Sequence, residues 1–279
     1  MSTFCLTNEN YHSLEANRLY FSASQVKRFL ECEAVAMAEL DGTYAREKGT
    51  ALLVGGYVDA HFSHELDLFC AQNPEIYTNK GTLRAEYSNA NDIIARIERD
   101  PLAMRMLDGD VQRIETGLIG SGYPFRVKLD CWLSAEKAQA IARDYPEMDD
   151  LLFAAGAIVD LKIMKDFAPL YRDGQGRLTF VEYWRYDLQL AIYQEIMWKR
   201  TGERVPCYIL GATKEKTTDI GLYQVPQELM DMSMEMMLEQ LPRIAAIKAH
   251  AEQPKRCEAC DYCKQTKVLT CASWLEDWA

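Results

Sequence analysis

Two apolar, strand-like segments near the middle of the sequence each carry an acidic residue close to their end. The first contains Asp130, and the second contains Asp160 followed two positions later by Lys162. Side chains two positions apart on a β-strand point to the same face, so Asp160 and Lys162 are expected to lie side by side. Carboxylates bind divalent cations, and an adjacent ammonium group can orient or deprotonate an attacking water. The pattern predicts metal-dependent phosphodiester cleavage, although an isolated Asp-x-Lys triplet is a weak signal.

Composition limits the classes of protein to consider. The chain has 279 residues, 48% of them hydrophobic, which suits one large domain. No segment approaches the ~18 to 20 apolar residues of a spanning helix, and the first ten residues lack a secretory signal, so a cytoplasmic protein is expected. The net charge of −11 counts against a broad nucleic-acid surface but permits a nuclease whose DNA contacts are confined to one channel.

The order of predicted elements indicates an α/β core with a mixed central sheet flanked by helices. We expect a single domain over 1–279, with a core at about 22–251 and a cysteine-rich tail at 252–279. Apolar periodicity and turn signals predict helices over 22–41, 51–70, 89–107 (interrupted at Asp100-Pro101), 184–200 and 227–251 (kinked at Pro242), and strands over 111–119, 125–132, 156–164, 205–213 and 218–225.

Cysteines concentrate in the tail. Nine cysteines without an export signal favour metal binding or catalysis over disulfides. Cys257, Cys260 and Cys263 form a C-x2-C-x2-C pattern that can turn three thiolates toward one metal centre. The fourth ligand is either the nearby Cys271 or Cys32 on the first helix, which would join the two ends of the domain. Zinc and a four-iron cluster both accept four thiolates, and the spacing does not choose between them.

Five segments follow one another in an order typical of one nuclease superfamily. They are Ser22-Ala-Ser24 to Cys32-Glu33, Gly55 to His61, Lys128-Leu129-Asp130, Asp160-Leu161-Lys162 and Gln189 to Tyr193. From about Ser22 to Lys267, the chain resembles the PD-(D/E)xK nuclease superfamily. Within it, the chain is similar to the RecE-like, or exodeoxyribonuclease VIII-like, exonucleases of phages and prophages.

The resemblance implies roles for the central residues. Asp130, Asp160 and the Leu161 carbonyl would bind Mg²⁺ or Mn²⁺, and Lys162 would position the attacking water or stabilise the transition-state phosphate. Relatives carry a further ligand after a glycine pair, which by strict counting falls on Asp59, with His61 as the alternative. Glu115, in the preceding strand, matches an acidic position of relatives more weakly.

The resemblance also extends to one helix and to the cysteines. Gln189 and Tyr193 lie four positions apart and share a helix face, which in the family enters the active site and contacts DNA. On periodicity alone, Gln189 would instead be a solvated residue of an amphipathic helix. Relatives use one early and three late cysteines to bind a 4Fe-4S cluster, which assigns that role to Cys32, Cys257, Cys260 and Cys263, with zinc as the alternative. The late cysteines of relatives are usually spaced differently.

The function implied by the resemblance is a magnesium-dependent exodeoxyribonuclease. It would degrade linear double-stranded DNA to leave single-stranded overhangs for a single-strand annealing protein during recombination, and it would act as a homo-oligomer, away from membranes. Three other functions stay open. They are a single-strand-acting nuclease of a repair or spacer-capture complex, a non-catalytic DNA-end-binding module, and a structural metalloprotein.

Overall fold

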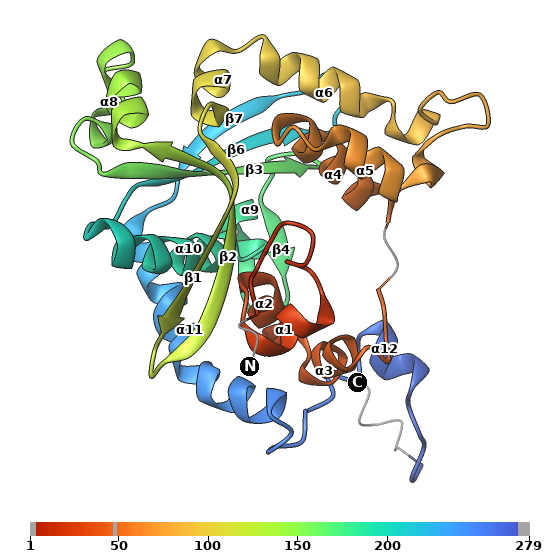
Figure 1. Cartoon of the computed structure of the whole chain (residues 1–279). Helices are drawn as coiled ribbons and strands as arrows, with labels where there is room; N and C mark the ends of the chain where they lie inside the picture. Colours follow the sequence, from red (N-terminus) through yellow and green to blue (C-terminus); the bar gives the residue numbers. More distant parts are fainter. Residues whose placement is uncertain (1–3, 47–48, 273–279) are drawn as a thin grey trace.

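A five-stranded mixed sheet forms the centre of the protein. The computed structural model describes residues 4–46 and 49–272, and helices cover both faces of its sheet (Figure 1). The strand order is β1-β2-β3-β6-β7, in which β3 and β6 are parallel and the other neighbours antiparallel. This confirms the predicted fold class. The strands are β1 (Asp110–Ile119), β2 (Tyr123–Ser134), β3 (Gly156–Met164), β6 (Cys207–Thr213) and β7 (Ile220–Gln224).

The helices form two layers, each with its own hydrophobic core. On one face, four helices contact the sheet: α4 (Thr50–Phe62), α6 (Asn89–Glu98), α7 (Pro101–Leu107) and α8 (Ala135–Asp144). On the other face, α10 (Tyr186–Thr201) packs across β1, β2 and β3 and is covered by α2 (Ala23–Glu31) and α11 (Gln227–Lys248).

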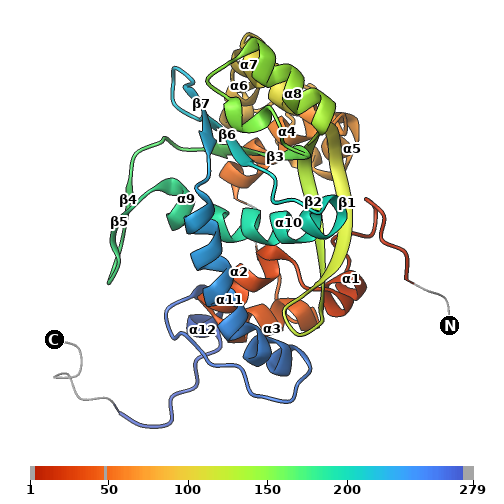
Figure 2. The same ribbon diagram turned by 90° about the vertical axis from the view of Figure 1, so that its left-hand side faces the viewer.

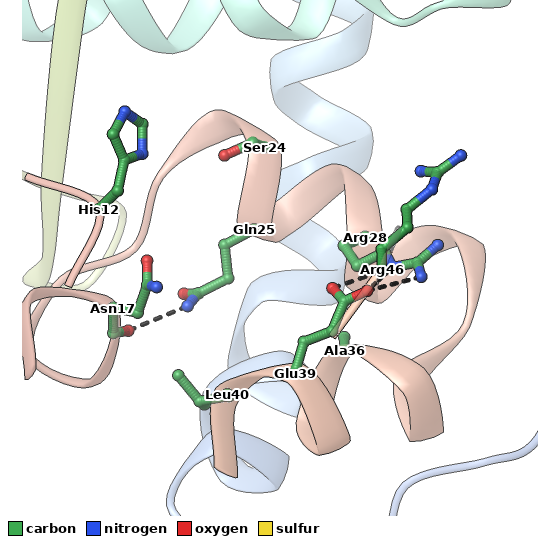
Figure 3. A pocket seen from close by; sticks show the side chains of 9 residues that line it. All are labelled: His12, Asn17, Ser24, Gln25, Arg28, Ala36, Glu39, Leu40 and Arg46. Carbon is green, nitrogen blue, oxygen red and sulfur yellow. Dashed lines mark hydrogen bonds and ion pairs between the residues drawn. The ribbon is translucent and has the colours of Figure 1, made fainter. Parts of the chain in front are cut away.

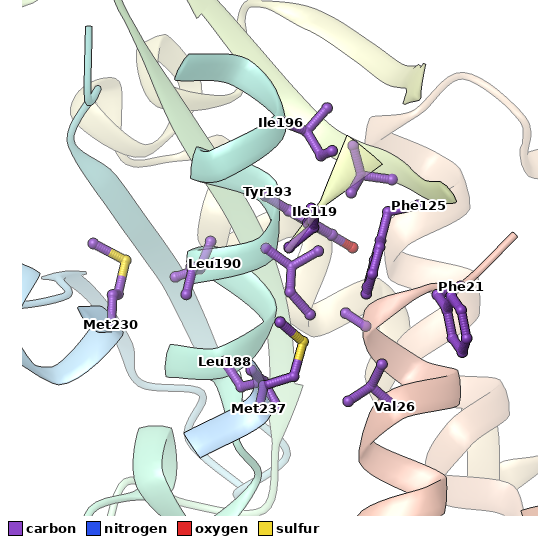
Figure 4. Packing of buried hydrophobic residues seen from close by; sticks show 14 of the residues in the cluster. Phe21, Val26, Ile119, Phe125, Leu188, Leu190, Tyr193, Ile196, Met230 and Met237 are labelled. Carbon is purple, nitrogen blue, oxygen red and sulfur yellow. The ribbon is translucent and has the colours of Figure 1, made fainter. Parts of the chain in front are cut away.

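Hydrophobic packing around α10 fixes the positions of α2 and α11. Leu188 and Ile192 of α10 are fully buried, as are Val26 of α2 and Met237 of α11. Figure 4 shows Leu188, Val26 and Met237 meeting in one interior cluster. Each such side chain contributes about 1.5 to 3 kcal/mol on burial. The helices α2 and α10 are therefore held firmly against each other and against the sheet.

Two predicted helices are each divided in the structure. The helix expected over 22–41 ends with α2 and restarts as α3 (Glu33–Asp41), because Cys32 adopts an extended backbone. The helix expected over 51–70 ends with α4 and restarts as α5 (Leu66–Gln72), with His64 at a left-handed φ of 61° between them. The break predicted at Asp100-Pro101 is confirmed, and α11 runs through Pro242 without interruption.

Several short elements complete the fold. A turn over 173–175 connects the two strands of a small hairpin that extends away from the main body (Figure 2). In the parts of the chain that are described, no helix is both long and apolar enough to cross a bilayer. The short elements are α1 (Leu14–Leu19), α9 (Phe180–Tyr183), α12 (Asp261–Gln265), β4 (Leu170–Arg172), β5 (Gly176–Leu178) and the 3-10 helices Pro74–Ile76, Ala85–Tyr87 and Asp149–Leu151.

Candidate active site and cysteine clasp

The two predicted metal-binding acids lie where β2 and β3 separate. Pairing between these strands reaches Cys131 opposite Val159 and stops there, one position before Asp130 and Asp160. The Oδ2 atom of Asp130 instead accepts a hydrogen bond from the Leu161 N–H at 3.0 Å. A side chain thus takes the place of a backbone partner, and this opens the sheet at the acidic pair.

Lys162 lies between the two carboxylates. Its Nζ is 2.5 Å from Asp160 Oδ2 and 3.6 Å from Asp130 Oδ2, and it donates to the Leu161 carbonyl at 3.3 Å. Burial favours a neutral lysine, but the Asp160 and Asp130 carboxylates outweigh it and raise the pKa of Lys162 above its ordinary value. Lys162 is therefore a fixed positive charge, suited to stabilising a phosphate rather than to removing a proton.

Gln189 lies against the acidic pair. Its Nε2 donates to Asp160 Oδ1 at 2.8 Å and to the Tyr193 hydroxyl at 3.3 Å. The i, i+4 spacing on α10 brings the two side chains together, as the sequence predicts. Tyr193 is buried, with 9% of its surface exposed. Gln189 thus contacts Asp160 directly, whereas Tyr193 supports Gln189 from behind.

Lys27 on α2 also reaches this site, and sequence reasoning missed it. Its Nζ donates to Gln189 Oε1 at 2.9 Å. Lys27 and Lys162 lie 5.0 and 5.3 Å from the centroid of the same ring, that of Tyr186. Burial and repulsion by Lys162 lower the pKa of Lys27 to about 7. The interacting side chain is 162 positions away in the sequence, so no local pattern could have indicated the contact.

Asp59 and His61, the alternative candidates on α4, point in different directions. Burial and the Asp130 carboxylate raise the pKa of Asp59 to about 7, which places Asp59 in the field of the acidic pair. Its Oδ2 also accepts a 3.4 Å hydrogen bond from Gln112. His61 instead contacts Glu98 on α6 at 2.9 Å. Asp59 is thus linked electrostatically to the acidic pair, whereas His61 pairs with α6.

Gln112 on β1 has a strained backbone beside this group. The ladder between β1 and β2 joins Val111 to Cys131 and Arg113 to Leu129, and skips Gln112 opposite Asp130. Gln112 has a φ of 51° and is buried. A non-glycine residue in this region costs on the order of 1 to 3 kcal/mol, and such residues concentrate at functional sites.

The donor types of the acidic group, rather than a closed set of distances, suit a hard divalent cation. Asp130, Asp160, Asp59 and the Leu161 carbonyl offer only oxygen atoms, the ligands that Mg²⁺ and Mn²⁺ prefer. Burial, together with repulsion from Asp130, raises the pKa of Asp160 to about 7 against the attraction of Lys162. A bound cation would relieve this crowding of negative charge.

Four cysteines form a second cluster beside the break between α2 and α3. The Sγ atoms of Cys32, Cys257, Cys260 and Cys263 all lie within 4.8 Å of one another. Cys32 Sγ is 3.6 Å from Cys263 Sγ, although 231 positions separate the two residues. The exposed Cys271 lies outside this group. We call these four residues the cysteine clasp, and their soft donors suit zinc or iron.

Charged contacts reinforce the clasp. Glu33, next to Cys32, accepts two hydrogen bonds from Arg243 of α11, both at 2.8 Å. It also accepts one from the backbone N–H of Lys255 at 2.6 Å. Figure 1 shows α12 beside α3. Next to the early cysteine, an ion pair thus joins α3 to α11 and a hydrogen bond joins α3 to the tail.

A further hollow opens beside α2 (Figure 3). Arg28, on its wall, forms three hydrogen bonds with Glu39, and Glu31 lies 3.1 Å away. Arg46 lines the same hollow. Two carboxylates thus already compensate Arg28.

Comparison with known proteins agrees with this geometry. Residues 22–140 and 146–266 match the model of a family described as a PDDEXK-like domain of unknown function (DUF3799). The chain belongs to this family. It is also similar to the crystal structure of a Eubacterium rectale protein described as a "putative exonuclease". The TM-score is 0.87, with 38% identity over 99% of this chain and 98% of that one. No protein with a curated description matches the sequence.

These findings confirm the resemblance to PD-(D/E)xK nucleases and support nuclease activity.

Glu115, the weaker sequence candidate, contacts Arg113 at 2.8 Å and Arg200 at 2.5 Å. It is buried within β1 and its ionic partners are these arginines. Glu115 therefore has a structural explanation that does not involve the acidic pair.

Proposed function

We propose that the protein is a divalent-metal-dependent exodeoxyribonuclease that degrades linear double-stranded DNA and leaves single-stranded overhangs. The observation that carries the proposal is the convergence of Asp130, Asp160 and Lys162 at the open end of the β2–β3 ladder. The exonuclease description of the Eubacterium rectale neighbour supports the same class of reaction. Delivery of the overhang to a single-strand annealing protein, and assembly into a homo-oligomer, belong to this proposal.

The residues have distinct parts in the mechanism. Asp130, Asp160, Asp59 and the Leu161 carbonyl would hold Mg²⁺ or Mn²⁺. When bound, such an ion polarises the phosphate and lowers the pKa of a coordinated water. Lys162 stabilises the negative charge that develops on the phosphate, and its effect is strengthened by the low dielectric of its buried position. Gln189 fixes the orientation of the Asp160 carboxylate through the 2.8 Å hydrogen bond.

Degradation of end-labelled linear duplex DNA in the presence of Mg²⁺ tests the proposal. We expect the native chain to shorten the duplex and Lys162→Ala to fail while remaining folded, and the label position gives the polarity. A preference for single strands would favour the repair or spacer-capture nuclease instead. If the native chain leaves both substrates intact but binds DNA ends, the protein is a binding module and the proposal is wrong.

We further propose that the clasp binds a single tetrahedral ion, zinc, rather than the 4Fe-4S cluster that the resemblance implies. Metal–sulfur bonds of about 2.3 Å in a tetrahedron place sulfurs about 3.8 Å apart. Two of the six sulfur–sulfur separations, Cys32–Cys263 and Cys257–Cys263 at 3.6 and 3.9 Å, agree with this spacing, and all lie within 4.8 Å. In a four-iron cluster each thiolate binds a different iron, which requires wider separations.

Elemental analysis of protein purified without oxygen tests the clasp metal. We expect one zinc per chain and no absorption in the visible range. Four irons per chain with a brown colour would show that the cluster is present and that the thiols move apart to bind it.

A further inference from the structure

Lys27 has an unusual environment for a lysine inside a protein. It donates one hydrogen bond, to the neutral Gln189 Oε1 at 2.9 Å. In residues 4–46 and 49–272, no carboxylate oxygen lies within 4.0 Å of its Nζ. An ammonium group carries three donors. Lys27 therefore has no carboxylate in direct contact among the described residues, and a neutral amide and the Tyr186 ring hold it in the interior of the site.

The two ammonium groups of the site can meet a further anion. Asp160, Asp187 and Glu31 attract the Lys27 ammonium without touching it, and Asp160 and Asp130 attract that of Lys162. A divalent cation bound to Asp130 and Asp160 would compensate these two acids and leave both ammonium groups available to an anion. A phosphodiester is the anion that a nuclease brings to such a position, and lysine binds phosphate as a point charge.

The helix that carries Lys27 is held rigidly. It lies on α2 between Val26 and Phe29, which are 0% and 3% exposed. Ser22 caps the start of the helix by accepting from the Gln25 N–H at 3.3 Å. The other end of α2 adjoins Cys32 of the clasp. Both ends of the helix are thus fixed, so Lys27 is pre-positioned instead of being recruited by the substrate.

We propose that Lys27 is a second phosphate-binding lysine of the catalytic centre. It contacts the phosphate diester held opposite Lys162, and at the same time directs the Gln189 amide toward Asp160. The inference deepens the proposed nuclease function and rests on it. It assigns to α2 a part in substrate binding, in addition to its part in the core.

The salt dependence of DNA binding provides the first test. Ca²⁺ replaces Mg²⁺ so that duplex DNA is bound without being cut, and Kd is measured across a range of salt concentrations. Each phosphate contact contributes about 0.9 to the slope of log K against log salt. We expect Lys27→Met to lower the slope by about that amount. Lys27→Gln should do the same, because it can still donate to Gln189 but has no charge, whereas Lys27→Arg should retain the slope.

Single-turnover cleavage with Mg²⁺ provides the second test. We expect about a 10- to 100-fold slower step for Lys27→Met, as for loss of a charged group that stabilises the transition state. Lys248→Met is the matched control, because Lys248 donates to Gln25 on the same helix at 2.9 Å and to the Tyr20 carbonyl at 2.7 Å. It should cleave at the native rate with an unchanged slope. Melting curves establish that all variants are folded.

The outcomes separate this inference from the proposed function. If the native chain cleaves DNA and Lys27→Met matches it in both rate and slope, the inference is wrong and the nuclease stands. If Lys248→Met loses as much as Lys27→Met, the effect reflects the packing of α2 and the inference is again wrong. If the native chain cleaves nothing, the nuclease proposal fails, while the binding slope still decides whether Lys27 contacts phosphate.

Discussion

The proposed catalytic centre and the cysteine clasp bring their candidate ligands together in opposite ways. Asp130 and Asp160 lie on adjacent strands of a buried sheet, so the backbone sets their separation. Cys32 and Cys263 come from a helix break and from the tail, and their neighbour Cys257 is exposed. The first site is supported by the core, whereas the second supports the attachment of a peripheral segment. Loss of a ligand should therefore cost mainly activity at the first site and mainly stability at the second.

Asp160→Asn should give the largest difference between the effect on activity and the effect on stability. We expect cleavage to fall by about a thousandfold or more, equivalent to roughly 4 kcal/mol of transition-state stabilisation, because a cation ligand is lost. The melting temperature should change little, since Lys162 keeps Asp130 within 3.6 Å as an ionic partner. Cleavage assays and melting curves on the same preparation measure both. A folded variant with near-native activity would remove Asp160 from the mechanism.

Cys263→Ser should show the reverse pattern. Cys263 is fully buried, and loss of a metal ligand that joins distant segments is expected to lower the free energy of unfolding by about 2 to 5 kcal/mol. Denaturant unfolding with metal analysis measures the effect. Cys271→Ser is the control, because Cys271 is exposed and lies outside the clasp. If both variants lost the same free energy of unfolding, Cys263 would not be a specific ligand of the clasp.

A comparison of Asp59→Ala with His61→Ala tests which of these two residues of α4 contributes to activity. Asp59 lies in the field of Asp130, whereas His61 contacts Glu98. We expect Asp59→Ala to reduce activity about 10- to 100-fold, as for loss of a supporting metal contact. His61→Ala should stay within about twofold. Activity titrated with Mg²⁺ checks this, since a weakened ligand set raises the metal concentration required. The opposite ranking would assign the ligand to His61.

The smallest effect should come from Glu33→Gln beside the clasp. Burial opposes ionisation, but hydrogen bonds from Arg243 and Lys255 lower the pKa of Glu33 below its ordinary value of 4.5. A carboxyl with a lowered folded-state pKa stabilises the protein above that ordinary value and loses its contribution as pH falls through the folded-state pKa. Melting curves of the native chain and the variant should therefore differ at neutral pH and converge in acid. A constant difference would exclude this ionic contribution.

Local pattern was enough to predict much of the fold and part of the site. The two-residue period of strands placed Asp160 and Lys162 on one side, and the helical period placed Gln189 near Tyr193. Both are properties of a few consecutive residues. The five strands of the sheet were predicted for the same reason, with differences only at their ends.

Features that depend on distant contacts were not predictable. Cys32 lies in a helical pattern that is continuous in the sequence, so the break between α2 and α3 was not expected, although Cys32 was a candidate ligand. Lys27 resembles any helix-surface lysine until α2 packs beside α10. The left-handed Gln112 lies in a segment that otherwise has an ordinary strand pattern. In each case the tertiary structure overrides the local preference.

The distance in sequence between Cys32 and Cys263 has a consequence for how the protein is made. The early cysteine leaves the ribosome 231 positions before its partner, at a rate of about 5 to 20 residues per second. The clasp can therefore close only once the 231 residues that follow Cys32 have been translated. Until then α2, which carries Lys27, is not joined to the tail through its C-terminal neighbour Cys32.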